Sequence, residues 1–377
     1  MRANDGNLGE WIVKAGEYAR DLHGHPEDSY KEFYSTELVR NFCRENNIIE
    51  IDLGLDTGFV GYINAGKDNC IAFRADLDAV ATENGPVHLC GHDYHTATLM
   101  GAAGYLSTIR EQLPYNVVLI FQPAEETTEG AKLLLTKGLM EKMPGKVVRL
   151  FGIHNRPEVE CGKVAVHKGP LMSEKADFWV TFKGKPGHGG EPDLCIDPII
   201  PAAQFITGAQ SIVSRNLNPL SEAVFGVYTI QSGTDELNPP EEAVIGGTFR
   251  ALSHEAYERM RERLETLAES TAKAYECESE LKIIPLTPLV DNTEKMYEVA
   301  YKAALEALGE KNIVDTEPTL ASDDFSVLGQ EMPAFYYWLG SGEPQKHSPA
   351  WHNPEFRIAD NYPEYAVKLL VSAALQC

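Results

Sequence analysis

The stretch Cys90-Gly-His-Asp-Tyr-His-Thr96 places a thiol, two imidazoles and a carboxylate within seven residues, beside a glycine. A thiolate and an imidazole separated by one residue, as in Cys90 and His92, can reach the same divalent ion from an irregular loop. Both groups are ligands that zinc and other borderline-soft metals accept. A chance cluster of reactive side chains is the alternative. The stretch therefore predicts a metal site or a nucleophile, provided that other segments converge on it.

The length and charge of the chain limit its class. Its 377 residues exceed one ordinary core and predict about two domains. With 33 basic and 56 acidic side chains the formal net charge is -23, so we expect neither a nucleic-acid nor an anionic-membrane partner. Seven irregularly spaced cysteines do not indicate a disulfide framework, which favours a cytoplasmic location. The sequence has no basic start followed by an apolar run, and no window reaches ~18 apolar residues. We therefore expect neither export nor a membrane span.

Strand and helix patterns alternate through the first part of the chain. The helical patterns cover 8–22, 32–45, 99–109 and 130–137, and the strand patterns cover 59–64, 70–74, 117–122 and 147–153. Such alternation predicts an α/β domain with a mostly parallel sheet covered by helices.

Polar side chains fall where the expected strands end. Asp76 and Asp78 follow one strand, Glu125 and Glu126 follow the next, and His154 follows the strand ending at residue 153. Ligand sites in open α/β sheets form along that edge. A solvated helix N-terminus is the alternative for the adjacent glutamates. In a metal site, one glutamate would bind the ion while the other acts as a base.

The pattern changes from about residue 173. Strand patterns at 176–182, 223–230 and 243–249, with helical patterns at 199–213 and 257–274, predict an inserted α+β domain. From about residue 286, a helix at 293–308, a segment at 322–328, a strand at 334–339 and a helix at 363–375 would complete the first domain. We expect the aromatic run at 335–338 in the core rather than in a substrate site. His347 and His352 are both candidate late ligands.

Seven motifs together resemble the successive signatures of the aminoacylase and carboxypeptidase-type metallohydrolases. They are Phe73-Arg-Ala-Asp-Leu-Asp78, Cys90-Gly-His-Asp-Tyr-His-Thr96, Phe121-Gln-Pro-Ala-Glu-Glu126, Gly152-Ile-His154, Gly184-Lys-Pro-Gly-His188, Gly246-Gly-Thr-Phe-Arg250 and His352-Asn-Pro-Glu-Phe356. The branch that the chain resembles most includes hippurate hydrolases, plant auxin-conjugate hydrolases and N-acetyldiaminopimelate deacetylases. The resemblance implies a metal-dependent amidohydrolase that cleaves a small N-acyl amino acid or a dipeptide-like substrate.

The resemblance also implies a domain division and a ligand set. The catalytic domain would comprise 1–172 and 287–377, and a dimerisation or lid domain would comprise 173–286. Two divalent ions (manganese, zinc, cobalt or nickel) would be bound by five ligands: Cys90, His92, Glu126, His154 and His352. His352 fits the last place better than His347, because the residues after it keep the family's spacing. Glu125 would be the general base.

Further roles follow from the same resemblance. His188 would polarise the scissile carbonyl, in the active site of the partner subunit of a homodimer. Arg250 would bind a substrate carboxylate, because its guanidinium forms two parallel hydrogen bonds. Asn238 is a second candidate for substrate binding. Asp78 would orient a metal ligand from the second shell.

The chain departs from the family pattern near the expected site. The segment between Asp78 and Cys90 is short and lacks the usual Pro-x-Gln-Glu run, and Asp76 stands where more distant relatives have a ligand histidine. We expect Asp76 to be a spectator. Two alternatives remain: an amidase with Cys90 as nucleophile and His92 or His95 as its base, and a non-catalytic metal-binding relative. Chelation separates the first alternative from a metal-dependent enzyme, and an intact Glu125 argues against the second.

Overall fold

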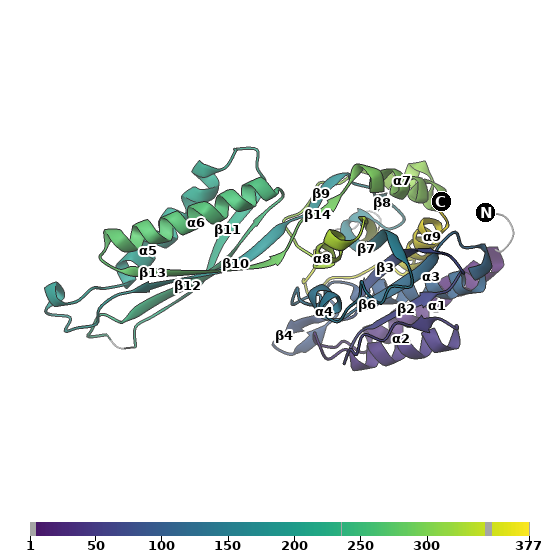
Figure 1. Ribbon diagram of the computed structural model, residues 1–377, viewed down its shortest axis with the longest axis horizontal. Helices are drawn as coiled ribbons and strands as arrows, with labels where there is room; N and C mark the ends of the chain where they lie inside the picture. The colour runs from purple at the N-terminus through teal and green to yellow at the C-terminus, as the bar shows by residue number, and fades with distance from the viewer. Residues whose placement is uncertain (1–4, 235, 344–348, 377) are drawn as a thin grey trace. The chain divides into compact units, whose positions relative to one another are not determined.

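The computed structural model describes residues 5–234, 236–343 and 349–376, and the chain forms two compact units (Figure 1). Unit one comprises Met1–Gly169, Asp291–Glu317 and Asp323–Cys377, and unit two comprises Pro170–Val290 and Pro318–Ser322. The sequence analysis predicted the domain boundaries at 172/173 and 286/287. The short segment 318–322 belongs to unit two because its backbone is hydrogen-bonded to the start of that unit. For example, Ser173 N–H donates to Ala321 O at 2.8 Å.

Unit one is built on an eight-stranded sheet in the order β1-β2-β6-β3-β7-β16-β8-β15. The strands are β1 (Ile49–Glu50), β2 (Phe59–Ile63), β3 (Asn69–Asp76), β6 (Asn116–Gln122), β7 (Lys146–Glu160), β8 (Val164–Ala165), β15 (Ile313–Val314) and β16 (Ala334–Gly342). The four central strands β6, β3, β7 and β16 are parallel. All seven residues of β6 are buried, so this strand is covered on both faces. The predicted mostly parallel α/β domain is confirmed.

Helices cover this sheet. They are α1 (Asp5–His23), α2 (Phe33–Glu45), α3 (His92–Thr108), α4 (Gly130–Thr136), α7 (Glu294–Leu308), α8 (Phe325–Glu331) and α9 (Tyr362–Leu375). α3 packs against α1 and α9. α3 and α1 approach closely because Gly104 has no side chain: a Cβ there would lie 2.2 Å from the ring of Trp11 on α1. The aromatic run at 335–338 is at most 1% exposed, as expected of core residues.

Two expectations about unit one were wrong in ways that affect the site. The helix expected at 99–109 begins at His92, so His92 and His95 lie on its first turns rather than in an irregular loop. Gly91 precedes it with φ +91°, a conformation that favours glycine, and a Cβ there would lie 2.4 Å from Asn155 Nδ2. The strand expected to end at residue 153 continues to Glu160, so His154 lies within β7.

Unit two has a four-stranded antiparallel sheet in the order β11-β12-β10-β13, with two long helices on one face (Figure 1). Its elements are β10 (Glu174–Lys183), α5 (Ile199–Ser211), β11 (Ala223–Ser232), β12 (Glu242–Ala251), α6 (His254–Ala274) and β13 (Glu278–Thr287). A separate core, including Phe178, Phe205 and Leu264, joins sheet and helices. The sequence did not reveal β13, because this partly exposed edge strand mixes charged residues and Pro285 with apolar ones.

The remaining elements are short. They are the strands β4 (Val80–Thr82), β5 (Gly85–Val87), β9 (Gly169–Met172) and β14 (Val290–Asn292), the 3₁₀ turns η1 (Arg110–Gln112), η2 (Pro192–Leu194) and η4 (Glu310–Asn312), and the π-helical turn η3 (Ile212–Asn216). The β4–β5 hairpin occupies the short segment between Asp78 and Cys90. Within the described residues, no helix has the length and apolarity needed to cross a membrane.

Candidate metal centre

Five of the predicted site residues meet in unit one. Cys90 Sγ lies 3.5 Å from His154 Nε2, and His92 Nε2 lies 3.9 Å from Glu126 Oε1. His352 Nε2 lies 3.6 Å from the same Glu126 oxygen. Cys90, His92 and His154 are buried, Glu126 is partly buried and His352 is exposed, so the cluster reaches from the interior to the surface of the unit.

The cluster divides into overlapping groups of three. Cys90, His92 and His154 form one group, and Cys90, Glu126 and His352 form another; within each, the ligand atoms all lie within 4.8 Å of one another. Ligand atoms bound ~2.0–2.3 Å from one zinc-type ion are ~3–4 Å apart. The spacing is therefore suitable for divalent ions.

The hydrogen bonding of these atoms supports the same assignment. His92 Nε2 and Glu126 Oε1 are buried, and neither has a hydrogen-bond partner among the described residues. A buried polar atom without a partner costs ~1–3 kcal/mol. Thiolate, imidazole and carboxylate donors together suit borderline divalent ions. The residues present thus fit the metals that the resemblance implies.

Backbone carbonyls fix the two buried imidazoles. His92 Nδ1 lies 2.9 Å from Asp78 O, and His154 Nδ1 lies 2.9 Å from Asn155 O. Because a carbonyl only accepts hydrogen bonds, each Nδ1 carries the hydrogen. In the neutral ring, the lone pair is then on Nε2, which is the atom that faces the cluster.

Asp78 holds the turn that carries the two glutamates. Its carboxylate accepts hydrogen bonds from the backbone N–H groups of Glu125 at 3.1 Å and Glu126 at 3.0 Å, and from Ser29 Oγ at 2.7 Å. Burial would raise the pKa of Asp78, but His92 and these donors outweigh burial and lower it. The turn is strained, since Ala124 has φ +56°. This geometry supports the prediction that Asp78 orients the metal ligands without binding a metal itself.

Asn155 connects three segments of the centre, and the sequence did not reveal it. Its side-chain amide donates to Cys90 O, and its Oδ1 accepts from Trp351 Nε1 at 3.1 Å, next to His352. Its backbone carbonyl accepts from His154. One partner is the adjacent residue, and the most distant lies 196 positions away along the chain. No local sequence pattern therefore indicates the role of Asn155.

Asp76 is fully engaged. One carboxylate oxygen lies 2.7 Å from His95 Nδ1, and the other accepts from Arg74 at 2.7 Å. Arg74 is buried and also pairs with Asp323 at 3.2 Å and Asp324 at 2.9 Å. This buried network, which the sequence also did not reveal, ties the end of β3 to the segment before α8. These contacts give Asp76 a supporting role in the network, and its carboxylate also forms, with His92 and His95, a group whose ligand atoms lie within 4.8 Å of one another.

Burial sets the acid–base character of the centre. It raises the pKa of Glu125 well above its usual range, and the nearby carboxylates of Asp323 and Glu126 raise it further. Burial also raises the pKa of the Cys90 thiol to about 12 and holds that of His154 well below its usual range. A reactive cysteine needs a lowered thiol pKa. The protein environment by itself therefore disfavours the Cys90 nucleophile.

Three further predicted residues lie in unit two: His188, Asn238 and Arg250. His188 is exposed, and its Nδ1 accepts from Gly190 N–H at 3.0 Å. Arg250 is partly buried and donates to Leu320 O at 3.0 Å. Asn238 lies on an exposed loop between β11 and β12. His347 lies outside the described residues, so only His352 is placed in the cluster.

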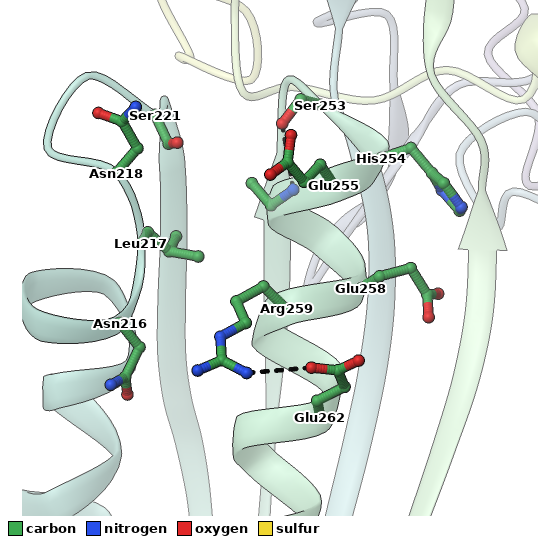
Figure 2. Close-up of a pocket in the computed structure, with 11 residues that line it drawn as sticks. Asn216, Leu217, Asn218, Ser221, Ser253, His254, Glu255, Glu258, Arg259 and Glu262 are labelled. Atoms are coloured by element: carbon green, nitrogen blue, oxygen red, sulfur yellow. Dashed lines mark hydrogen bonds and ion pairs between the residues drawn. The ribbon is translucent and has the colours of Figure 1, made fainter.

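Unit two also has a pocket of about 480 Å³ beside the first turns of α6 (Figure 2). Its lining includes Asn218, Ser253 and Arg259, and Arg259 is paired with Glu262 at 3.1 Å. Among the described residues, no group with metal-binding spacing includes a residue of this pocket. All of the residues that line this pocket belong to unit two.

The fold and the centre together define a class of protein. A mostly parallel α/β unit with clustered Cys, His and Glu side chains, interrupted by an α+β unit, is the architecture of a two-domain metallohydrolase. Residues 72–376 match the family model described as peptidase family M20/M25/M40. The chain belongs to this family and is a metal-dependent amidohydrolase, which confirms the resemblance seen in the sequence.

The similarity to known proteins extends over nearly the whole chain. An N-acetylcysteine deacetylase of Bacillus subtilis is 36% identical over 352 residues, covering 90% of each protein. An IAA-amino acid hydrolase (ILR1-like 5) of Arabidopsis thaliana is 32% identical, covering 97% of this chain and 86% of that one. The crystal structure of Bacillus subtilis YXEP, described as a dinuclear metal-binding peptidase of the M20 family, has a TM-score of 0.83 at 31% identity and covers 97% of this chain and 98% of that chain.

Proposed function

We propose that this enzyme hydrolyses the amide bond of a small N-acyl amino acid or a dipeptide-like substrate, using two divalent ions. The similarity to an N-acetylcysteine deacetylase and to an IAA-amino acid hydrolase supports the substrate class. The observation that carries the proposal is the pair of ligand groups that share Cys90: one with His92 and His154, the other with Glu126 and His352. Five ligands in two overlapping groups suit two neighbouring ions. The mixed donors suit manganese, zinc, cobalt or nickel.

Glu125 is proposed as the general base. When bound, the ions would acidify the attacking water and polarise the substrate carbonyl. Glu125 Oε2 lies 3.8 Å from His92 Nε2, at the edge of the cluster, so its carboxylate is close to the proposed ions. It would accept the proton of the attacking water and then donate that proton to the leaving amine.

The proposal assigns substrate contacts to unit two and makes the enzyme a homodimer. His188, exposed and flanked by Gly187 and Gly189, would donate to the scissile carbonyl oxygen in the partner's active site. Arg250, whose guanidinium has five donors, would bind the substrate carboxylate, and Asn238 would add a hydrogen bond.

An exposed apolar surface supports dimerisation through unit two. Tyr228 and Ile230 on the edge strand β11 are 69% and 55% exposed, and Trp179 on β10 is 38% exposed. An edge strand with exposed apolar side chains is a natural pairing surface.

A cytoplasmic location is also part of the proposal. The described cysteines are free thiols, as expected in a reducing compartment.

The proposal is tested with a panel of N-acyl amino acids and dipeptides, assayed with metal-free enzyme and after each of the four metals is added back. We expect hydrolysis of at least one N-acyl amino acid, with the amine and the acid released in equal amounts, only after metal is restored. Hydrolysis of none of the panel by metal-loaded enzyme would contradict the proposed substrate class.

A further inference from the structure

Unit one contains a second cavity, of about 220 Å³, that none of the proposed metal ligands lines. It is bounded by the end of α1, the segment at 88–94 and the segment at 356–360. The segment at 88–94 contains Cys90 and His92, and the segment at 356–360 follows His352 along the chain. Ile358 also packs on Gly91, where a Cβ would lie 2.6 Å from Ile358 Cδ1. An occupant of this cavity would therefore touch segments that contain or follow three proposed ligands.

Two buried side chains in the cavity wall have polar atoms without a hydrogen-bond partner among the described residues. His88 is 4% exposed, and neither of its ring nitrogens has a hydrogen-bond partner among the described residues. Asp93 is 2% exposed; its Oδ2 lies 2.7 Å from His23 Nδ1, whereas its Oδ1 has no partner in the described part of the chain. Each such atom costs ~1–3 kcal/mol if nothing binds it. The wall thus lacks a hydrogen-bond donor for Asp93 and partners for the imidazole.

Charged groups of both signs stand at the rim. Arg20, Arg357 and Asp360 line the cavity and are exposed. Among the described residues, none of the three forms an ion pair within 4.0 Å, although Arg357 donates to nearby backbone carbonyls. A guanidinium group without an ion-pair partner can bind a carboxylate or another oxyanion. The buried Phe356 and the partly buried Ile358 provide an apolar wall.

We propose that this cavity binds a small free α-amino acid as its zwitterion. The amino acid carboxylate would lie against Arg20 and Arg357, and its ammonium group would donate to Asp93 Oδ1. A simple carboxylate would leave Asp93 without a donor, and a simple amine would leave the guanidinium groups unpaired; an amino acid satisfies both. Pockets for drug-sized ligands occupy ~300–1,000 Å³, so a cavity of about 220 Å³ suits a smaller molecule. The inference does not depend on the proposed function, because no proposed catalytic residue lines the cavity.

Isothermal titration calorimetry of the metal-loaded enzyme tests the proposal. The ligands are the free amino acids, with acetate and L-alaninamide as probes that lack the ammonium or the carboxylate. We expect at least one small amino acid to bind, with acetate and alaninamide weaker by ~10-fold or more, the effect of losing one charged contact. Absence of binding by every amino acid would overturn the proposal, and acetate binding as tightly as the best amino acid would make the cavity a simple anion site.

Variants locate the binding. Arg20→Met and Arg357→Met alter exposed side chains, so the fold should survive, and each should weaken amino acid binding by ~10-fold. Arg44→Met, an equally exposed arginine on α2 outside the cavity, is the matched control and should bind as wild type does. Arg250→Met should also bind normally, which separates this site from product binding at the residue proposed to hold the substrate carboxylate. Binding that survives both cavity variants, or that is lost in Arg250→Met, would overturn the proposal.

Discussion

The two units place their candidate site residues in opposite ways. In unit one, the ligand candidates are held by buried hydrogen bonds from several elements: Asp78 fixes the glutamate turn, and Asn155 links three ligand segments. In unit two, His188 is exposed, and its ring accepts a hydrogen bond from the nearby Gly190 N–H. A rigid centre suits metal binding, whereas exposed side chains suit contacts made only when substrate or a second subunit is present. Substitutions of the ligand candidates in unit one should therefore change metal binding, whereas substitutions of the candidate residues in unit two should leave the metal content unchanged.

Glu125→Gln should give the largest loss of turnover with metal retained. Removing a general base lowers kcat by ~10²–10⁴. Glu126→Gln is the matched variant one residue away, and it should lose metal as well as activity, because Glu126 alone of the two faces His352. Metal analysis beside kinetics decides between the two roles. Equal metal loss in both variants would contradict the division of labour.

His188→Ala should lower kcat by ~10²–10³ without loss of metal, since it removes one donor to the substrate carbonyl. Mixing it with Glu125→Ala tests whether His188 acts across the dimer. With random subunit exchange, half of the dimers are mixed and each has one intact site, so roughly a quarter of wild-type activity should return. No recovery, with exchange confirmed independently, would place His188 in its own chain's site.

Asn155→Leu should weaken metal binding by ~10–100-fold, the usual effect of removing a partner that orients ligands. Leucine keeps the branched shape of asparagine but has no hydrogen-bonding groups, so the change removes these hydrogen bonds. Asn41→Leu, on the surface helix α2, is the control and should bind metal normally. Unchanged metal affinity in Asn155→Leu would show that the ligand segments are held without this residue.

Phe205→Ala should have the smallest effect on the metal centre. Phe205 is fully buried in the core of unit two, so its loss should destabilise that unit by ~3–5 kcal/mol. Because the ligand candidates lie in unit one, metal content should stay at the wild-type value when measured well below the melting temperature. A parallel loss of metal would show that the two cores are not energetically separate.

The sequence predicts regular elements well where apolar spacing is clear, as in α1, β6 and β16. It fails where that spacing is absent: β13 mixes charges with apolar residues, and the early start of α3 rests on polar residues at 92–95. The ligand set was predicted from the resemblance to the family. The spacing of residues alone was also compatible with Cys90 as a nucleophile. Asn155 and the Arg74 network were missed because buried polar residues that bond to distant segments leave no periodic signal.

The most direct test of the central claim is the number of ions that unit one binds. Metal-free protein is titrated with manganese or zinc by calorimetry, and bound metal and amide hydrolysis are measured on the same samples. Two ions per chain, with activity that appears as they bind and a reduced count in Cys90→Ser, is the predicted result. Full activity in the metal-free protein, abolished by alkylation of Cys90, would contradict the account and establish the cysteine mechanism instead.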